Sequence, residues 1–355
     1  MKVIQILTNL NWGDAISNDV LAVDEALKQH GYDSRIMAIT IHESLLSKAQ
    51  FIDMSSIKPE DLVIFHKSTG DALTGRLTEL SCKKGIIYHN ITPAKMILPY
   101  DPVMSCVLYI GRRQLKKYLG QYDFAWGVSQ YNCQELQLMG MDKKKTAILP
   151  ILIKQHPIQP DSVLLEQLKQ SNGIKLLFIG RISPQKKQED IIKTYWYVLQ
   201  QDSMARLFLV GKWDGMEKYY AKLKGFCADL GLTDQQVTFT GGVSEAEKEA
   251  YLTGADVLVC MSEHEGFCVP LLEAMNHDLP IVAYQAGAVS ETLGDSGIQF
   301  KEKDYPAIAR AIIKLKTNQQ YYQDTVMKQQ ERQQQYDYQV VQDKLFDLIN
   351  GVMHE

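Results

Sequence analysis

Chemically capable residues are concentrated in the segment Ser262–Met275, which reads SEHEGFCVPLLEAM. Pro270 suits the first turn of a helix, because its missing N–H group costs nothing at that position. The start of such a helix favours a bound anion, since backbone N–H groups and the helix dipole point toward it. We therefore expect an anion to be held by the backbone of three consecutive residues, Gly266, Phe267 and Cys268.

Two carboxylates flank this turn, eight positions apart. Glu273 lies about one helical turn inside the predicted helix, where it could accept hydrogen bonds from vicinal hydroxyls such as those of a ribose. Glu265 precedes the turn and would face the group attached beyond the phosphates. The arrangement fits a nucleotide-diphosphate-sugar, with Glu273 binding it and Glu265 acting on it. Taken alone, the same two residues could be a surface loop acid and a solvated helix residue.

Cations are supplied by a second segment, FIGRISPQKKQEDII (Phe178–Ile192). When a sugar nucleotide loses its diphosphate, negative charge grows on the phosphate oxygens, and fixed cations aimed at that charge lower the barrier. Arg181 could clamp phosphate bidentately and Lys186 could act as a point charge. The alternative is a solvated turn after a strand, and Lys187 could replace Lys186.

A histidine and two loop residues are further candidates in the first half of the chain. His89 ends the apolar run GIIYH, with His66 after DLVIF as a weaker copy. Gly13 would allow close backbone approach to phosphate or acceptor, and Asp14 could orient an acceptor hydroxyl. A helix-capping role for Ser17 or Asp19 explains part of the same loop, and His89 could simply be satisfied at a strand end.

The paired glycines of FTGGVS suggest a place where backbone groups border the base of a nucleotide. Gly242 is the residue of this pair that we assign to donor binding. Metal binding is not indicated, because the sequence has no D-x-D pair and no His/Cys zinc spacing. Lys, Arg and a helix terminus could do the electrostatic work of an ion, so we expect a reaction without metal or other cofactor.

Composition points to a globular protein with real cores: 355 residues, 45% hydrophobic and 23% charged. The net charge of −4 does not indicate nucleic-acid binding. The chain starts MKVIQIL, which is typical of a first strand rather than a signal peptide. Its six cysteines form no C-x-x-C pair and are expected to be reduced, so we expect a cytoplasmic protein. A position at the inner face of the membrane stays open.

Apolar runs alternate with helical spacing along the whole chain, which predicts parallel sheets covered on both faces. The runs predicted as strands are VIQIL, RIMAI, DLVIF, GIIYH, FAWGVS and TAILP in the first half, and KLLFIG, RLFLVG, VTFTG, DVLVCMS and PIVAY in the second. The predicted fold is α/β, with two Rossmann-like doubly wound domains facing a central cleft. Ligands of such sheets bind beyond the carboxyl ends of the strands. The predicted parts are an acceptor-side domain, a Pro-containing linker, a nucleotide-sugar-binding domain, and an amphipathic helix that returns to the first domain: 1–155, 156–172, 173–335 and 336–355.

The segment SEHEGFCVPLLEAM resembles the signature of the family 4 glycosyltransferases, which have the two-domain GT-B fold. FIGRISPQKKQEDII resembles the same family's strand, loop and helix, with Arg181 and Lys186 at the matching positions, which implies that both are catalytic. LFLVGKWDG, QVTFTGGVS and DLPIVAYQAGAVSE are similar to its later strand-end loops, whereas WGDAISNDV and YHNITP match bacterial members less specifically. One departure is Cys268, where the family commonly has a second glycine.

The resemblance implies a retaining transfer of a sugar from a nucleotide-diphosphate donor to a hydroxyl acceptor, in the synthesis of a bacterial polysaccharide, glycolipid or glycoprotein. It also implies that His89 contacts the donor sugar or the reacting centre. UDP is favoured as the nucleotide on general frequency alone. Two alternatives remain: a nucleotide-sugar epimerase of the same fold, and a catalytically silent protein that binds a sugar nucleotide. A dehydrogenase is disfavoured because no G-x-G-x-x-G follows a strand.

A basic stretch, GRRQLKKYL (Gly111–Leu119), has helical spacing. It could touch anionic lipid or the phosphate of a lipid-linked acceptor. Basic surface helices are also common without such a role. The cations in question are Arg112, Arg113, Lys116 and Lys117.

Overall fold

The computed structural model describes residues 2–154 and 157–354. The chain divides into two compact units. Unit 1 comprises Met1–Ala94, Val103–Gln155 and Tyr336–Glu355, and unit 2 comprises Lys95–Pro102 and His156–Gln335.

Unit 1 is built on a seven-stranded sheet within the described residues, in the order β3-β2-β1-β4-β5-β6-β7. All of its neighbouring strands run parallel. Every residue of β4 is buried, as expected for a strand covered on both faces. The strands are β1 (Lys2–Leu10), β2 (Asp33–Ile41), β3 (Gln50–Phe51), β4 (Leu62–Lys67), β5 (Lys83–Tyr88), β6 (Phe124–Gly127) and β7 (Thr146–Ile148).

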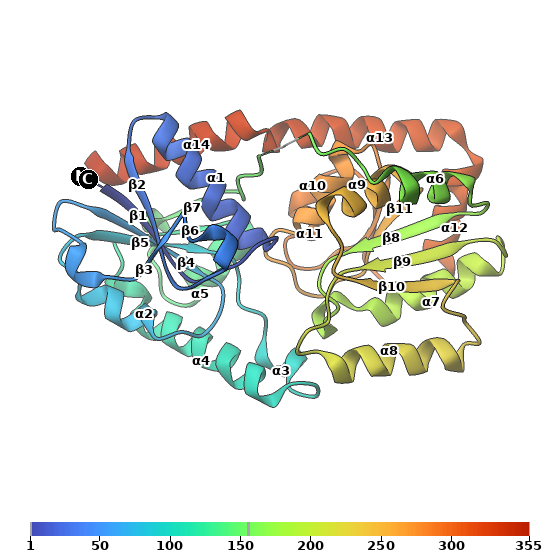
Figure 1. Cartoon of the computed structure of the whole chain (residues 1–355), viewed down its shortest axis with the longest axis horizontal. Coiled ribbons are helices and arrows are strands. Elements are labelled where there is room, and N and C mark those ends of the chain that lie inside the picture. Colours follow the sequence, from blue (N-terminus) through green and yellow to red (C-terminus); the bar gives the residue numbers. More distant parts are fainter. Residues whose placement is uncertain (1, 155–156, 355) are drawn as a thin grey trace. The chain divides into compact units, whose positions relative to one another are not determined.

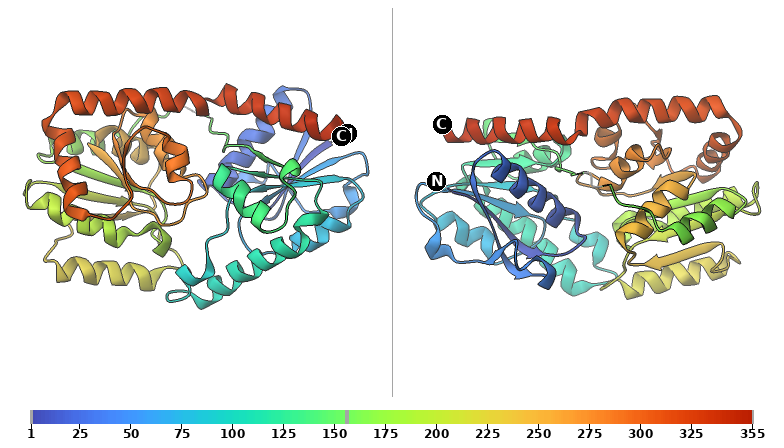
Figure 2. Two further views of the ribbon diagram at one scale, coloured as in Figure 1. Left: turned by 180° about the vertical axis from the view of Figure 1, so that it is seen from behind. Right: turned by 45° about the horizontal axis from the view of Figure 1, so that its top comes forward.

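The helices of unit 1 cover both faces of this sheet. Crossovers between parallel strands are right-handed, so the helix between β1 and β2 lies on the face opposite to the helices that follow β4. Figure 1 shows α1 on one side and α2 and α4 on the other. Both views of Figure 2 show α14 on the same face as α1. The helices are α1 (Ala15–Gln29), α2 (Leu73–Arg76), α3 (Ala94–Ile97, at the junction with unit 2), α4 (Pro102–Tyr118), α5 (Gln130–Leu138) and α14 (Tyr338–His354).

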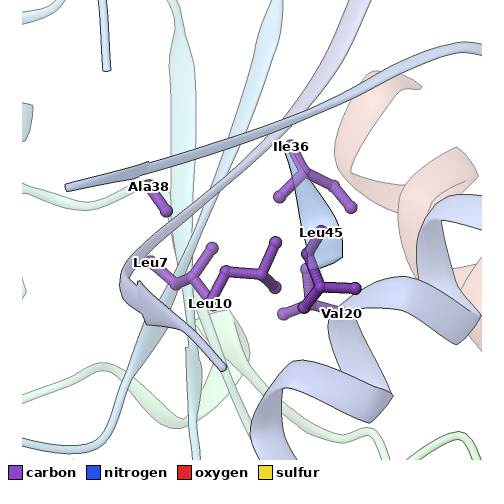
Figure 3. Packing of buried hydrophobic residues seen from close by; sticks show 6 residues of the cluster. All are labelled: Leu7, Leu10, Val20, Ile36, Ala38 and Leu45. Atoms are coloured by element: carbon purple, nitrogen blue, oxygen red, sulfur yellow. The ribbon is translucent and has the colours of Figure 1, made fainter. Parts of the chain in front are cut away.

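The core of unit 1 beside α1 is made by side chains from β1, β2, α1 and the short 3-10 helix Glu43–Leu45. Figure 3 shows these side chains converging between the helix and the strands. The packing fixes the carboxyl end of β1 and the start of α1, which is where the loop with Gly13 and Asp14 lies. The cluster consists of Leu7, Leu10, Val20, Ile36, Ala38 and Leu45.

Unit 2 contains a six-stranded parallel sheet within the described residues, in the order β10-β9-β8-β11-β12-β13. Its strands are β8 (Lys175–Ile179), β9 (Arg206–Val210), β10 (Val237–Gly241), β11 (Val257–Cys260), β12 (Ile281–Tyr284) and β13 (Ile298–Phe300). The predicted apolar runs match these strands, except β13, which the sequence did not reveal; β3 of unit 1 was missed in the same way. Both missed strands are short and lie at a sheet edge.

The helices of unit 2 again lie on both faces, with α7 and α8 on the side opposite to α9 and α10 in Figure 1. They are α6 (Ser162–Gln170), α7 (Gln188–Leu199), α8 (Glu217–Asp229), α9 (Glu245–Gly254), α10 (Val269–Asn276), α11 (Val289–Leu293), α12 (Tyr305–Thr317) and α13 (Gln319–Gln333). None of the helices in residues 2–154 and 157–354 is long and apolar enough to span a bilayer.

The units differ from the predicted domain ranges in two places. The predicted linker, 156–172, groups with unit 2 and contains α6, because Asp161 caps a helix there. Lys95–Pro102 groups with unit 2, although it lies between parts of unit 1 in the sequence. The ring centroids of its Tyr100 and of Tyr219 on α8 lie 5.1 Å apart in an edge-on arrangement. The Tyr100 hydroxyl accepts a hydrogen bond from the Lys222 ammonium at 3.1 Å. Tyr336–Glu355 groups with unit 1, so the last helix returns to the first unit as predicted.

Candidate active site

Two loops of unit 2 meet where its strand order reverses. β8 pairs with β9 on one side and with β11 on the other, and the chain leaves β8 and β11 in opposite directions across the sheet. Ligands of open parallel sheets bind beyond the carboxyl ends of the strands at such a point. The loop after β8 contains Arg181 and Lys186, and the loop after β11 contains Glu265 and Cys268.

Lys186 and Glu265 form an ion pair between these loops. The Lys186 ammonium lies 2.6 Å from Oε1 and 2.8 Å from Oε2 of Glu265. The Glu265 side chain is 7% exposed and the Lys186 side chain 19%. Burial disfavours the ammonium, but the adjacent carboxylate outweighs it, so the pKa of Lys186 is raised above its ordinary value. Lys186 is therefore a permanent cation at physiological pH.

The backbone of Glu265 is anchored by the loop after β12. Its carbonyl accepts a hydrogen bond from the Ala288 N–H at 3.0 Å. A Cβ atom at Gly287 would lie 2.6 Å from that carbonyl oxygen, and Gly287 has a φ of +55°. Only glycine fits both the close approach and the positive φ. This contact holds the Glu265 carboxylate in place against Lys186.

The N-terminus of α10 follows directly. Cys268 is its N-cap, in the left-handed conformation with φ 75° and ψ 67°, and Pro270 lies in its first turn as predicted. The Phe267 side chain is buried in the core, and its carbonyl accepts a hydrogen bond from the Thr292 hydroxyl at 2.6 Å. Gly266 is half-buried at the turn. The three residues predicted to cradle an anion thus form the short connection into α10.

The Cys268 side chain points to a second thiol that the sequence analysis did not single out. Its Sγ atom lies 3.9 Å from Sγ of Cys260, the last residue of β11. Cys260, Glu265 and Cys268 are all buried, and their ligand atoms lie within 4.8 Å of one another. No sequence signal predicts this contact, because the two cysteines are eight positions apart and lack a metal-binding spacing.

Glu273 lies on α10 with a different partner. Its carboxylate accepts a hydrogen bond from the Lys248 ammonium on α9 at 3.0 Å, and Lys248 also pairs with Glu245 at 2.7 Å. Burial opposes the Lys248 charge, but the two carboxylates outweigh it and raise its pKa. The Glu273 side chain is 20% exposed, so it is accessible to a ligand on one side.

Arg181 is exposed just beyond β8, and its Nη2 donates to the Asp214 carbonyl at 2.6 Å. The guanidinium is thereby held toward the loop after β9. Gly242, predicted to border a nucleotide base, lies under the Lys212 side chain, because a Cβ atom there would come within 2.5 Å of Lys212 Cε. A ligand at Gly242 would have to displace that flexible side chain.

His89 belongs to a buried hydrogen-bonded chain in unit 1. It follows β5 directly, and its Nε2 lies 2.9 Å from Nδ1 of His66. His66 Nε2 lies 2.9 Å from Oε1 of Gln5, whose Nε2 donates to the Val20 carbonyl. Since Oε1 of Gln5 can only accept, His66 donates from Nε2 and must accept at Nδ1 from His89 Nε2–H. Neutral His89 then has an acceptor lone pair on Nδ1.

That Nδ1 atom of His89 is buried and has no hydrogen-bond partner among the described residues. Burial lowers the pKa of His89 to about 3, and burial together with the neighbouring His89 lowers the pKa of His66 well below its ordinary value. Both rings are therefore neutral at physiological pH. His89 can accept a hydrogen bond there but cannot supply positive charge.

Asp19 lies near the same ring nitrogen of His89, with Oδ2 3.8 Å from Nε2. Burial raises the Asp19 pKa to about 7, although the Leu152 N–H donated to its carboxylate at 2.7 Å favours the ionised form. Asp19, His66 and His89 could also surround a metal ion by proximity. The hydrogen-bonded chain already uses the lone pair of His66 Nδ1 and the proton of His89 Nε2, however.

The loop after β1 corrects part of the sequence interpretation. The Asp14 carboxylate caps α1, accepting from the Ser17 N–H and the Ser17 hydroxyl, each at 3.1 Å. The cap is Asp14 itself, whereas the sequence analysis considered Ser17 or Asp19 for that role. Gly13 has a φ of +73° and nothing within 4 Å of a built Cβ atom, so its backbone conformation requires glycine and its surface is open.

The four cations of the basic stretch in α4 do not share one exposed face. Arg112 is turned inward: it donates to the Ile91 carbonyl and to Glu135, each at 2.7 Å. It therefore holds unit 1 together and does not belong to the exposed basic face. Arg113, Lys116 and Lys117 remain exposed.

The structure thus brings Lys186, Glu265 and Cys268 together in unit 2, and His89 with His66 in unit 1. Glu273 and Arg181 have partners of their own, Lys248 and the Asp214 carbonyl. Sequence reasoning overlooked the roles of Gln5, Lys248 and Cys260. Gln5 and Lys248 act through contacts with residues distant in the sequence, and the contact between Cys260 and Cys268 belongs to no motif.

The unit 2 residues of this site lie in a part of the chain that matches a protein family. Residues 165–337 match the family model of glycosyl transferases group 1. Over 127 residues the chain is 32% identical to the 2-deoxystreptamine glucosyltransferase of Streptomyces kanamyceticus, covering 36% of this chain and 32% of that protein. It is 26% identical over 172 residues to the N-acetyl-alpha-D-glucosaminyl L-malate synthase of Bacillus anthracis, covering 45% of this chain and 42% of that protein. Both matches span less than half of the relative's length.

Solved structures show the same fold over nearly the full chain. HepE of Anabaena, solved in complex with UDP, superposes with a TM-score of 0.77 at 16% identity, covering 99% of this chain and 100% of that one. WaaG, a glycosyltransferase involved in lipopolysaccharide biosynthesis, superposes with a TM-score of 0.73 at 14% identity, covering 98% and 100%. The chain therefore has the GT-B fold, and its residues 165–337 match the family model of glycosyl transferases group 1.

Proposed function

We propose that the protein is a retaining, metal-independent glycosyltransferase of family 4 type, which moves a hexose from a UDP-sugar to a hydroxyl acceptor in bacterial polysaccharide, glycolipid or glycoprotein synthesis. The observation behind this proposal is the Lys186 ammonium held on buried Glu265 at the start of α10. A permanent cation and a helix N-terminus beyond two strand ends suit the diphosphate of a sugar nucleotide.

In this proposal the leaving diphosphate is neutralised by Lys186, Arg181 and the backbone at the start of α10. The Arg181 guanidinium is exposed and supported by the Asp214 carbonyl, so its remaining N–H groups can reach a phosphate. Glu273 binds ribose hydroxyls, with Lys248 holding its carboxylate in place. These cations take the electrostatic role that a divalent ion would otherwise have.

Glu265 stabilises charge in this scheme and does not attack the sugar. Both of its carboxylate oxygens lie on the Lys186 ammonium, which reduces their nucleophilicity. Retention, inferred from the family 4 resemblance, would then follow a front-face route assisted by the leaving phosphate. The acceptor would approach on the face from which the diphosphate departs.

We assign the acceptor and the donor sugar's remaining contacts to unit 1. The unpartnered Nδ1 lone pair of His89 suits a sugar hydroxyl, which can donate to it. Gly13 and Asp14 lie at the open loop after β1, where Asp14 keeps lone pairs beyond its capping bonds.

We further propose that the enzyme works on the cytoplasmic side of the membrane and touches it through α4. One face of this helix exposes cations beside apolar side chains, including Val103 at 76% and Tyr109 at 53% exposure. Such a face suits an anionic bilayer that holds a lipid-linked acceptor. Co-sedimentation with anionic vesicles should weaken when Arg113, Lys116 and Lys117 are all changed to Glu, and unchanged binding would contradict this contact.

The central experiment is a panel of UDP- and GDP-sugars incubated with the protein in EDTA, read by release of free nucleotide. The proposal expects slow donor hydrolysis that one acceptor class accelerates, with an anomeric configuration in the product equal to that of the donor. Donor binding without turnover for any acceptor would favour a silent binding protein. An epimerised nucleotide sugar would favour an epimerase, and activity lost in EDTA would contradict metal independence.

Two variants test the assigned roles. Glu273→Ala should weaken UDP binding about tenfold, because hydrogen bonds to a charged acceptor are lost. Arg181→Ala should mainly lower kcat, by about a hundredfold, as expected for a group that acts on charge formed in the transition state. Lys187→Met serves as a matched control, since the Lys187 ammonium lies 3.3 Å from Glu263, whereas Lys186 is the lysine that pairs with Glu265. Wild-type kinetics in both test variants would remove this site assignment.

A further inference from the structure

The proposed reaction uses no thiol, yet two buried thiols lie against the ion pair of Lys186 and Glu265. Cys260 is 4% exposed and Cys268 is 8% exposed. Cys268 stands in the left-handed conformation, which costs a residue other than glycine roughly 1–2 kcal/mol. The fold keeps this side chain despite that cost, which calls for a role for the sulfur atom.

The separation of the two sulfur atoms matches a known coordination geometry. In a tetrahedral zinc site with Zn–S bonds of about 2.3 Å, two thiolates lie about 3.8 Å apart. The Sγ atoms of Cys260 and Cys268 are 3.9 Å apart, so they need almost no movement to bind one ion. A carboxylate oxygen of Glu265 lies within 4.8 Å of both and is the third ligand atom of the group.

A small cavity adjoins these three ligand groups. Its volume is about 10 Å³, and its lining includes Cys260, Glu265, Cys268, Ser262 and Pro270. This is about the space of one water molecule. It is therefore far too small for a sugar or a nucleotide, but it is of the right order for a single ion.

We propose that Cys260, Cys268 and Glu265 form a binding site for one thiophilic divalent cation, of which Zn²⁺ is the type. Soft thiolate ligands select zinc-like ions, whereas Mg²⁺ and Ca²⁺ prefer oxygen ligands. The fourth position is left for water or an anion. The cluster Asp19, His66 and His89 is a weaker candidate, because the deduced tautomers use the lone pair of His66 Nδ1 for His89 Nε2–H and leave His89 a free lone pair only on Nδ1, the nitrogen that does not contact His66.

The charge balance of this buried site favours a divalent cation. Without metal, the Glu265 carboxylate and the Lys186 ammonium cancel. When a divalent cation binds, both thiols release their protons to solvent, so two thiolates and one carboxylate offset the ion and the ammonium. The site is electrically neutral in both states, which avoids the cost of a net buried charge.

Binding would draw the Glu265 carboxylate toward the metal and away from Lys186. The ion should therefore inhibit transfer rather than support it, a consequence that rests on the proposed function. The binding site itself does not depend on that function.

Cobalt titration tests the site directly. The whole protein, reduced and freed of metal with a chelator, should bind one equivalent of Co²⁺ with near-ultraviolet thiolate-to-cobalt absorption that Zn²⁺ displaces. Cys260→Ser and Cys268→Gly should each lose at least half of that absorption and weaken zinc affinity by about tenfold or more. Cys268→Gly suits the positive φ, so its fold is retained. Cys106→Ser, which changes an exposed cysteine, is the matched control.

Two results would overturn the site. One is the absence of thiolate absorption in the fully reduced protein. The other is cobalt binding that persists in both cysteine variants and is lost in His66→Ala, which would place the metal at the histidines. The activity readout is separate: the ratio of transfer rates with and without Zn²⁺ should be well below one in the wild type and close to one in Cys260→Ser. If metal binds as described but no donor is ever turned over, the proposed function fails and the metal site stands.

Discussion

The ion pair of Lys186 and Glu265 at the candidate site is largely buried. Lys186 and Glu265 satisfy each other with two short contacts between loops 79 residues apart in the sequence. Breaking a buried pair by removing one partner is far more costly than removing an exposed pair, because the remaining charge stays desolvated. The stability of the donor loops is thus tied to the residue proposed to neutralise the leaving group.

Lys186→Met should therefore lower the free energy of unfolding by about 3 kcal/mol, because it leaves the Glu265 carboxylate buried without its cation. Urea unfolding at neutral pH measures this. The matched change Lys187→Met removes a more exposed ion pair to Glu263 and should cost less than about 1 kcal/mol. Equal losses in the two variants would mean that Glu265 is solvated when Lys186 is absent.

Asp19 provides a pH-dependent test in unit 1. Its pKa is raised to about 7, so the protonated carboxyl contributes stability that is complete below the ordinary value of 3.8 and is lost as pH rises through about 7. Asp19→Asn keeps an acceptor for the Leu152 N–H and cannot ionise. It should gain up to about 4 kcal/mol over wild type between acidic pH and about pH 8.

Denaturant unfolding across that pH range reads the difference between wild type and variant. The titration of His89, whose pKa is lowered to about 3, is common to both proteins and cancels to first order. Asp33→Asn is the control: Arg35 lowers the pKa of this exposed carboxyl, so no gain at high pH is expected. A pH-independent effect of Asp19→Asn would show that Asp19 stays ionised in the fold.

The helices place these side chains through their starting points. Asp14 caps α1, Pro270 lies in the first turn of α10, and Ser244 caps α9 with a full capping box to Glu247. The α9 start matters for the site because Lys248, one residue beyond the box, pairs with Glu273 on α10. A helix end is thus part of the support for the proposed ribose contact.

Ser244→Ala should lower the free energy of unfolding by about 1 kcal/mol, because the Glu247 N–H at the start of α9 loses its acceptor. Thermal unfolding followed by circular dichroism measures the shift. Ser203→Ala, at an exposed turn outside any helix, should leave the midpoint unchanged. If the two variants melt together, the capping box is not formed in solution.

The whole chain consists of two units whose sequence segments interleave. The last helix, α14, belongs to unit 1 although it follows unit 2 in the sequence. Its Phe346 ring stacks on His30 at 3.8 Å, and Leu345 is fully buried. Lys95–Pro102 makes the reverse exchange by joining unit 2. Each unit therefore includes a segment that is separated in the sequence from the rest of that unit by residues of the other unit.

Leu345→Ala should destabilise unit 1 selectively, by roughly 3 kcal/mol, because a buried leucine side chain is removed from its packing. Hydrogen exchange should speed up in β1 and β4 but not in β8 and β11. Leu315→Ala, in α12 of unit 2, should produce the opposite pattern. Loss of protection in β8 from the Leu345 change alone would contradict the assignment of α14 to unit 1.

Much of the fold could be predicted because it depends on local patterns. The apolar runs that became β1, β4, β8 and β11 are continuous, and parallel strands with right-handed crossovers leave few possible topologies. Pro270 likewise predicted the start of α10, because proline is favoured in the first turn of a helix. The short edge strands β3 and β13 were missed because two or three residues form too weak a pattern.

The sequence alone was sufficient for the alternating architecture, the loops at the strand ends, and the candidates Glu265 and Lys186, because strand and helix periodicity and a recognisable motif are properties of neighbouring residues. The contact partners of these residues could be identified only from the folded chain. The meeting of Cys260 with Cys268, the chain from His89 through His66 to Gln5, and the inward turn of Arg112 all depend on contacts between separate elements. Burial and hydrogen bonding across such contacts set charge and reactivity, and no local pattern encodes them.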